Sequence, residues 1–255
     1  MRRSSIPFVS FVVGIALVMV GCDSTPIDAD EGAGGSGALL SDDEGSAGAA
    51  ATNSCSGALR QSLSLVDAVS TATVTLLSES GSELLVYVDA SVGGINGQDD
   101  FPWVYLSLAT GSGVAVGDID ALDSLDWDLA LKRNIIRTNG GDSGPGQGGA
   151  LRVALAWEDV DASTLGTRPV PVEDWFDDEC NLTLSADANE LITTYSGWSQ
   201  YDLQTHVLTP VDAVYLTQGA DGSLYKVAIL DYYSNPNGTH GNTPGRYQLR
   251  IAPLP

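Results

Sequence analysis

The stretch from Asp126 to Ala150 narrows the folds open to this chain more than any other segment. It joins a short apolar and cationic run, which has Trp127 near its start, to a loop with six glycines between Gly140 and Gly149. Glycine accepts a positive φ without steric cost, so such a loop indicates sharp turns or a close approach to other backbone. We therefore expect a strand anchored by Trp127, followed by a loop that packs closely against neighbouring backbone.

The remainder of residues 57–255 predicts a mostly β domain. Several segments are rich in Val, Leu, Ile, Thr and Tyr and alternate apolar with polar positions, as half-buried strands do. Clusters of Gly, Asn, Asp and Pro separate them, and the loop from Gln218 to Ser223 is typical of a hairpin. Short helices are expected at 57–70 and 118–125. The expected strands lie near residues 71–78, 83–90, 102–109, 128–137, 151–157, 213–218, 224–233 and 246–252.

The N-terminus has the pattern of a bacterial lipoprotein signal. Arg2 and Arg3 precede a short apolar run, which ends in Met-Val-Gly directly before Cys22. A basic start, a short apolar core and small residues at the cleavage point are typical of a secretory signal, and a run of this length is marginal for spanning a bilayer. We expect removal of residues 1–21 and lipidation of Cys22; the alternative is an ordinary secretory signal that leaves Cys22 free or disulfide-bonded. Asp23, next to the anchor, leaves retention at the inner membrane open.

Residues 22–56 differ in composition from the domain that follows. They are rich in Gly, Ala, Ser, Asp and Glu, and they contain no aromatic or basic residue. Such a segment cannot bury enough apolar surface to offset its ordering entropy, so we predict a disordered acidic tether. Removal of the signal takes two basic residues and no acidic one, which changes the formal net charge from −22 to −24. So acidic a surface repels nucleic acid and anionic lipid headgroups, and we expect membrane contact through the lipid anchor only.

Lipidation of Cys22 would leave an even pair of cysteines, Cys55 and Cys180, in an oxidising compartment. A disulfide between them would close a loop of about 125 residues and stabilise the fold by about 5 kcal/mol in the chain-entropy treatment. Two free thiols are the alternative, because the sequence does not show the geometry of the two side chains.

The segment after Asp126 also resembles a known family. Its pattern W-D-x-A-x-x-R-x-x-I-x-T-N-x-G, followed by S-G-x-G-x-G-G-A, is similar to the core signature of HmuY-like lipoproteins, the haem-binding haemophores of Gram-negative bacteria. Weaker matches before and after it, among them 103–108 and 201–210, extend the resemblance to about residues 84–252. The resemblance implies a single HmuY-like β domain of antiparallel strands in the cell envelope, with haem held as cofactor by two axial side chains.

The same resemblance raises the question of which side chains would bind the iron. Proteins hold haem iron with His, Met, Cys or Tyr. Both methionines lie within residues 1–21, so the processed chain would have none, and its histidines are His206 and His240. A bis-His site would have to use both. The alternatives are that His206 makes a structural hydrogen bond at a strand start and that His240 is a solvated loop residue. Tyrosines are further candidates, and nothing in the sequence selects one.

Four basic residues reverse the local charge of this acidic chain: Lys132, Arg133, Arg137 and Arg152. Haem propionates would pair with such residues through charge-assisted hydrogen bonds. On one continuous strand from 128 to 137, Arg133 and Arg137 would share a face, and Lys132 would point the opposite way. We therefore take Arg133 and Arg137 as candidates for propionate pairing; the alternative is cross-strand pairing with carboxylates.

Patterns for other chemistries are missing from the sequence. The glycine loop lacks the Gly-Lys-Ser/Thr ending of a P-loop, and neither a Gly-x-Ser-x-Gly elbow nor an EF-hand loop occurs. We therefore expect a binding protein rather than an enzyme, with no metal beyond haem iron.

The first hypothesis is a lipoprotein, placed by the resemblance in the outer membrane, that binds haem or a related tetrapyrrole for iron acquisition and passes it to a TonB-dependent receptor. The alternative is an envelope interaction or structural lipoprotein that keeps the fold without the iron ligands.

Overall fold

The computed structural model describes residues 55–183 and 191–254. The predicted signal peptide, the lipidation site Cys22, Asp23 and the tether up to residue 54 lie outside these residues. No helix in the described part of the chain is long and apolar enough to cross a membrane.

Short strands joined by turns and 3-10 segments make up the described chain. The helices are α1 (Ser56–Ser62) and α2 (Gly94–Gly97), with 3-10 helices η1 (Gln98–Asp100), η2 (Asp120–Leu122), η3 (Gly141–Ser143), η4 (Trp157–Asp159) and η5 (Ala162–Leu165). The strands are β1 (Val74–Ser80), β2 (Glu83–Asp89), β3 (Val104–Ser107), β4 (Ser112–Val114), β5 (Leu129–Lys132), β6 (Ile135–Thr138), β7 (Gly149–Val153), β8 (Ser199–Asp202), β9 (Val207–Pro210), β10 (Val214–Gln218), β11 (Leu224–Asp231) and β12 (Arg246–Pro253).

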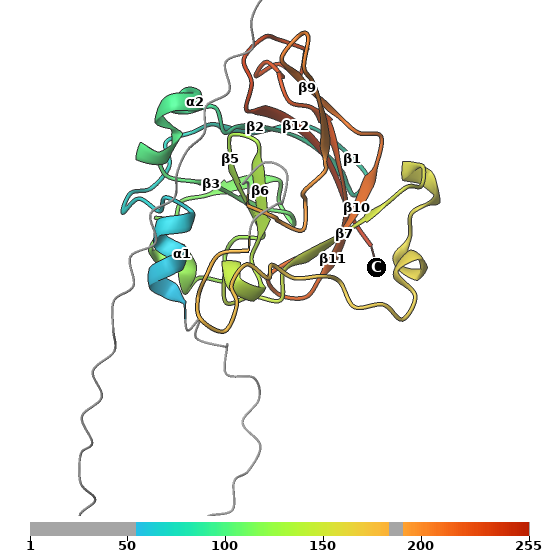
Figure 1. The fold of residues 1–255 in the computed structure, drawn as a ribbon. Coiled ribbons are helices and arrows are strands. Elements are labelled where there is room, and N and C mark those ends of the chain that lie inside the picture. Colours follow the sequence, from blue (N-terminus) through green and yellow to red (C-terminus); the bar gives the residue numbers. More distant parts are fainter. Residues whose placement is uncertain (1–54, 184–190, 255) are drawn as a thin grey trace, which may run out of the picture. The chain divides into compact units, whose positions relative to one another are not determined.

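Antiparallel pairing joins these strands into three sheets within the described residues. The largest has the order β1-β2-β12-β11-β10-β7, the second has the order β4-β3-β5-β6, and β8 pairs with β9 alone. Figure 1 shows the green strands β3, β5 and β6 beneath the band formed by β2 and β12. The prediction of a mostly β domain of antiparallel strands with few short helices is confirmed.

Strands β3, β5 and β6 of the four-stranded sheet are buried on both faces. On one face, apolar side chains such as Leu106 and Leu131 join the main core, which the inward residues of β2, β11 and β12 complete. On the other face, Trp103 and Trp127 belong to a second core, which Leu59 of α1 covers. Burial of both faces explains why this region of the sequence is apolar at consecutive positions rather than at alternate ones.

The glycine loop has the close packing that its composition predicts. Trp127 is buried, and its indole N–H donates to the carbonyl of Ala121 at 2.9 Å. The backbone N–H of Gly148 donates to the carbonyl of Asn139 at 2.7 Å. A Cβ added at Gly140 or Gly148 would overlap the backbone of the opposing segment, so only glycine permits this approach.

The expected strand at 128–137 is in fact a hairpin. β5 and β6 pair with each other, so that Ala130 faces Arg137 across the ladder and Lys132 faces Ile135. The chain turns between them at Arg133, which has a φ of +52°. The prediction that Arg133 and Arg137 share one face of a single strand is therefore wrong. Lys132 and Arg137, which were expected on opposite faces, both point toward the second core.

Other boundaries differ more modestly. The helix expected at 57–70 ends at Ser62, and the one expected at 118–125 is only the 3-10 turn η2. The strand expected at 151–157 ends at Val153, after which the backbone leaves the sheet toward η4. The hairpin loop from Gln218 to Ser223 is confirmed by the pairing of β10 with β11. Strands β4, β8 and β9 were not predicted.

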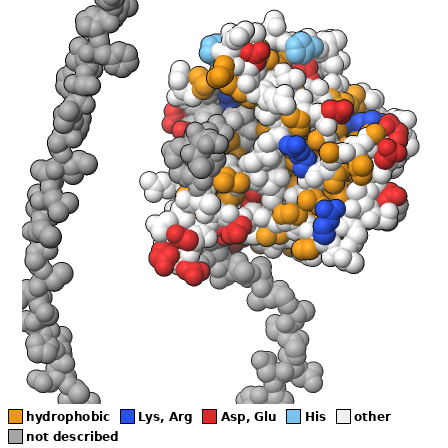
Figure 2. Space-filling model, turned by 45° about the vertical axis from the view of Figure 1, so that its right-hand side comes forward, with side chains coloured by type: hydrophobic (Ala, Val, Ile, Leu, Met, Phe, Trp, Pro, Cys, Tyr) orange, Lys and Arg blue, Asp and Glu red, His pale blue; other side chains and the backbone are white. Residues whose placement is uncertain are grey.

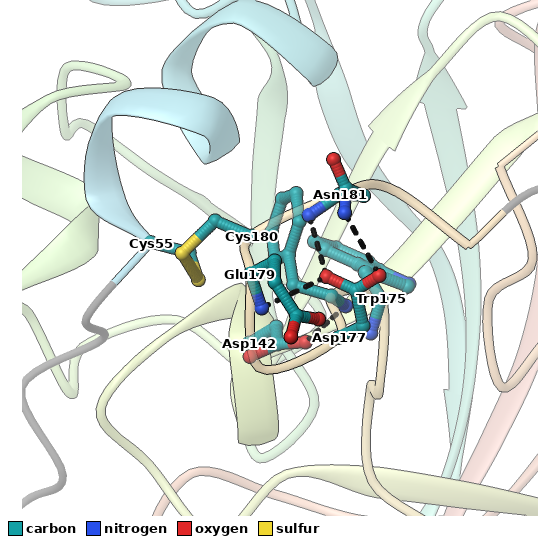
Figure 3. The surroundings of a disulfide bond; sticks show 8 residues. Cys55, Asp142, Trp175, Asp177, Glu179, Cys180 and Asn181 are labelled. Atoms are coloured by element: carbon teal, nitrogen blue, oxygen red, sulfur yellow. Dashed lines mark hydrogen bonds between the residues drawn. A yellow bond between two sulfur atoms is a disulfide. The ribbon is translucent and has the colours of Figure 1, made fainter. Parts of the chain in front are cut away.

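A disulfide joins Cys55 to Cys180, with 5.3 Å between the two Cα atoms (Figure 3). Cys55 directly precedes α1, and Cys180 lies in a tight turn. In that turn the Asp177 carboxylate accepts the backbone N–H of Asn181 at 2.8 Å. The bond therefore fastens the start of the described chain to a turn that lies 125 residues later in the sequence.

Candidate functional site

A cavity of about 390 Å³ opens beside the β8–β9 hairpin, on the face of β11 and β12 that points away from the main core. We call it the His240 cavity. Strand β9, the end of β11, a residue of β12 and the loop after β11 all contribute to it. Its lining residues are Val207, Leu208, Thr209, Pro210, Leu230, Asp231, Tyr233, Gly238, His240 and Gln248.

His240 is held in place by three neighbours. Its Nδ1 lies 2.9 Å from Oδ2 of Asp231, and its ring lies edge-on to that of Tyr233, with 6.0 Å between the centroids. Its backbone carbonyl accepts an N–H of Asn235 at 3.2 Å. The imidazole itself remains 73% exposed. Nε2 has no hydrogen-bond partner among the described residues, so it is the nitrogen that is available to a ligand.

His206 occupies the turn between β8 and β9, where its φ is +58°. Its Nδ1 lies 2.6 Å from the hydroxyl of Tyr201, and the side chain is exposed. His206 does not line the cavity, although its neighbour Val207 does. Figure 2 shows both histidines at the same end of the molecule, with an acidic side chain between them.

Apolar side chains surround this end of the molecule. Leu230 in the cavity is 48% exposed, and Leu203 at the tip of the hairpin is 80% exposed. Tyr201 and Val207 on the same hairpin are also partly exposed. Exposed apolar groups that cluster around a concave site are more informative than single ones, because they indicate a surface that an apolar ligand or partner covers.

The lining of the cavity contains Asp231 and, among the described residues, no Lys or Arg. No group of three or more His, Cys, Asp or Glu side chains that could hold a metal ion occurs among the residues that the structure describes. The cavity therefore offers one imidazole, one phenol and apolar walls, rather than a set of ligands for a bare metal ion.

The structure places the two arginines predicted for propionate pairing elsewhere. Arg137 is fully buried in the second core, and its guanidinium lies 4.8 Å from the ring centroid of Trp103 and 4.7 Å from that of Trp127. Arg133 donates to the carbonyl of Pro244 at 3.0 Å. Neither residue lines the His240 cavity, and the burial of Arg137 removes it from contact with any ligand in solvent.

Lys132 lies in the same core as Arg137. Its ammonium donates to the carbonyl of Ser64 at 3.0 Å and lies 5.3 Å from the ring centroid of Trp103. Burial lowers the pKa of Lys132 to about 8, because the charged form loses its water. Keeping Lys132 protonated therefore costs more free energy in the folded protein than in the unfolded chain.

This burial predicts a pH dependence of stability. The folded-state pKa of Lys132 lies below its unfolded value, so protonation favours unfolding. The stability that neutral Lys132 allows is therefore lost as the pH falls through about 8. Relative to Lys132→Met, the free energy of unfolding of the wild type should rise by about 2 kcal/mol between about pH 7 and about pH 10. Urea denaturation of both proteins across this range measures the difference. A difference that stays constant with pH would contradict the assignment.

Sequence reasoning missed most of this site. It named His240, but not Asp231, Tyr233 or Leu230 as its neighbours. Asp231 and Tyr233 lie within a stretch that matches the family pattern, yet nothing in that match distinguishes a cavity residue from a core residue. Asp231 lies nine residues before His240, and this spacing alone does not predict a contact between them.

Comparisons with known proteins place the chain among relatives. The sequence matches the HmuY protein family over residues 99–247, which is more than half of the chain. No curated protein is similar enough to count as a match. The solved structures that are similar to it include three crystal structures. A candidate lipoprotein from Bacteroides fragilis is 20% identical, with a TM-score of 0.43, over 69% of this chain and 94% of that chain. A candidate HmuY-like haem-binding protein from Bacteroides vulgatus is 17% identical, with a TM-score of 0.42, over 72% and 97%. The apo HmuY analogue of Tannerella forsythia is 15% identical, with a TM-score of 0.42, over 73% and 98%.

Proposed function

Because the chain belongs to the HmuY family, we propose that it binds haem or a related tetrapyrrole in the His240 cavity. The observation that supports this most strongly is an exposed imidazole at the edge of a partly apolar cavity, with Nδ1 held by a carboxylate and Nε2 free among the described residues. Haem-binding histidines need this arrangement, because a partner on one ring nitrogen orients the ring and leaves the other nitrogen for iron. The role is binding rather than catalysis.

The cavity suits a flat, apolar ligand with one ligating edge. Val207, Leu208 and Leu230 offer apolar walls on one part of the cavity. Burial of these groups against a porphyrin would supply the hydrophobic part of the binding free energy.

His206 would be the second side chain to hold the iron of the tetrapyrrole. It lies on the hairpin that borders the cavity, and both histidines occupy the same end of the molecule (Figure 2). The two histidines come from separate elements, the turn between β8 and β9 and the loop after β11. Since the lining has no Lys or Arg, the propionates would face solvent rather than Arg133 or Arg137.

We further propose that the protein is an envelope lipoprotein, anchored through Cys22 to the outer membrane, that passes its ligand to a TonB-dependent receptor. The signal pattern before Cys22 and the family membership support this. The tether would join the domain at Cys55, which directly precedes α1.

One observation favours a second function. His240 lines the cavity and His206 does not. Of the two histidines, the described structure therefore places only one in the cavity as a candidate for binding iron. An envelope protein that kept the fold and the apolar end for contact with another protein would need no second ligand. The two functions differ in whether the protein takes up haem at all.

A haemin titration separates them. The chain from residue 22 onward, with Cys22→Ser to prevent lipidation, should show a saturable change in its haem absorption bands at micromolar haemin. His240→Ala should weaken binding at least about tenfold, and His206→Ala should abolish the low-spin bis-His spectrum. Arg133→Ala serves as the matched control and should bind as the wild type does. A wild type without a saturable change would refute haem binding, and an unchanged His240→Ala would place the ligand elsewhere.

A further inference from the structure

The end of β11 contains a bulge that directs two consecutive side chains toward the cavity. Ile229 pairs with Leu249, but the next pair in the ladder is Asp231 with Gln248, so Leu230 is an extra residue on β11. In a regular strand Asp231 would share the inward face of Ile229, which belongs to the main core. The bulge reverses this, and Leu230 and Asp231 both face the cavity together with Gln248.

The carboxylate of Asp231 is fixed at both oxygens. Oδ1 accepts the backbone N–H of Tyr233 at 2.9 Å, and Oδ2 lies 2.9 Å from Nδ1 of His240. The Asp231 side chain is only 14% exposed, whereas that of His240 is 73% exposed. The less mobile of the two groups is therefore the carboxylate, and it sets the position of the imidazole.

We infer that Asp231 is a positioning residue for His240. A carboxylate can only accept, so the neutral imidazole must carry its proton on Nδ1, which leaves the lone pair on Nε2. Asp231 thereby selects the tautomer that can bind iron and fixes the ring at the cavity. The effect of Asp231 on haem binding rests on the proposed function. The tautomer of His240 does not, because it is a property of the ligand-free protein.

The second histidine has a weaker partner. Nδ1 of His206 faces the hydroxyl of Tyr201, which can either donate or accept. The tautomer of His206 is therefore not imposed by its neighbour. The two histidines therefore differ. Only for His240 does a neighbouring side chain fix which ring nitrogen carries the lone pair before haem binds.

The substitution Asp231→Asn tests this sharply, because it keeps the shape and reverses the polarity. The Asn carbonyl still accepts the N–H of Tyr233, and its NH₂ group then donates to Nδ1 of His240. This moves the imidazole proton to Nε2 and blocks the ligating nitrogen. Asp221→Asn, in the β10–β11 hairpin loop, is the matched control.

Two readouts decide the inference. ¹⁵N NMR of the ligand-free chain, at a pH well above the ordinary His range, should show His240 protonated at Nδ1 in the wild type and in Asp221→Asn, and at Nε2 in Asp231→Asn. Haemin affinity should fall roughly 10- to 100-fold in Asp231→Asn alone. An unchanged tautomer, or a changed tautomer with unchanged haemin affinity, would overturn the inference. Failure of the wild type to bind haemin would refute the proposed function instead, and the NMR result would still decide whether Asp231 sets the state of His240.

Discussion

Removal of the disulfide by Cys55→Ser and Cys180→Ser together should lower the free energy of unfolding by about 5 kcal/mol. The bond closes a loop with a sequence separation of 125 residues, so its loss restores a large conformational entropy to the unfolded chain. It also secures α1, because Leu59 of α1 and Leu63 directly after it pack in the second core. We expect α1 to be the first element to lose protection from hydrogen exchange.

Urea denaturation of the double variant and the wild type measures this loss. Wild-type protein treated with a thiol reductant provides the control, because it lacks the same bond without any substitution and should lose a similar free energy. Thiol titration of the unreduced Cys22→Ser protein should find no free cysteine. A double variant within about 1 kcal/mol of the wild type would show that the bond contributes little.

Arg137→Ala should lower the free energy of unfolding by about 3–5 kcal/mol. The Arg137 guanidinium is fully buried between Trp103 and Trp127, and it donates to the hydroxyl of Tyr105 at 2.9 Å and to the carbonyl of Ser143 at 2.9 Å. Truncation removes the donor from both acceptors and opens a space among aromatic rings. The Tyr105 hydroxyl in turn donates to Asp118 at 3.1 Å, so the loss extends into a buried network.

Arg137→Lys distinguishes charge from shape. Lysine keeps the positive charge but lacks the planar fork that stacks on aromatic rings and reaches two acceptors, so this variant should lose at least about 2 kcal/mol. Arg168→Ala, at an exposed arginine, is the matched control and should stay within about 0.5 kcal/mol of the wild type. Urea denaturation followed by tryptophan fluorescence reports on both. An Arg137→Ala variant as stable as the control would contradict a structural role for the buried guanidinium.

The strands of the two larger sheets were mostly predictable, because their apolar patterns reflect burial. The β5–β6 hairpin was not, since its turn at Arg133 and Asn134 contains neither Gly nor Pro and both flanking strands are apolar. The run therefore resembled one longer strand. That single error placed Arg133 and Arg137 on a common face, and it led to the prediction that they pair with haem propionates.

The site was less accessible to sequence reasoning than the fold. His206 and His240 could be named because few residue types bind haem iron. The Asp231 side chain points toward the cavity because of the bulge at Leu230, and no residue type at that position predicts a bulge. The cavity itself is assembled from β9, β11, β12 and a loop, so it exists only after strands distant in sequence have paired.

Haemin added to the ¹⁵N-labelled chain, with gallium protoporphyrin as the diamagnetic control, locates the ligand by paramagnetic broadening of nearby amide signals. If haem binds in the His240 cavity, the signals of residues 207–210, 230–233 and 238–240 should disappear with haemin and persist, shifted, with gallium protoporphyrin. Signals from α1 and the second core should be unaffected by either. Broadening centred on other elements, or no change in any signal at saturating haemin, would contradict a tetrapyrrole site in this cavity.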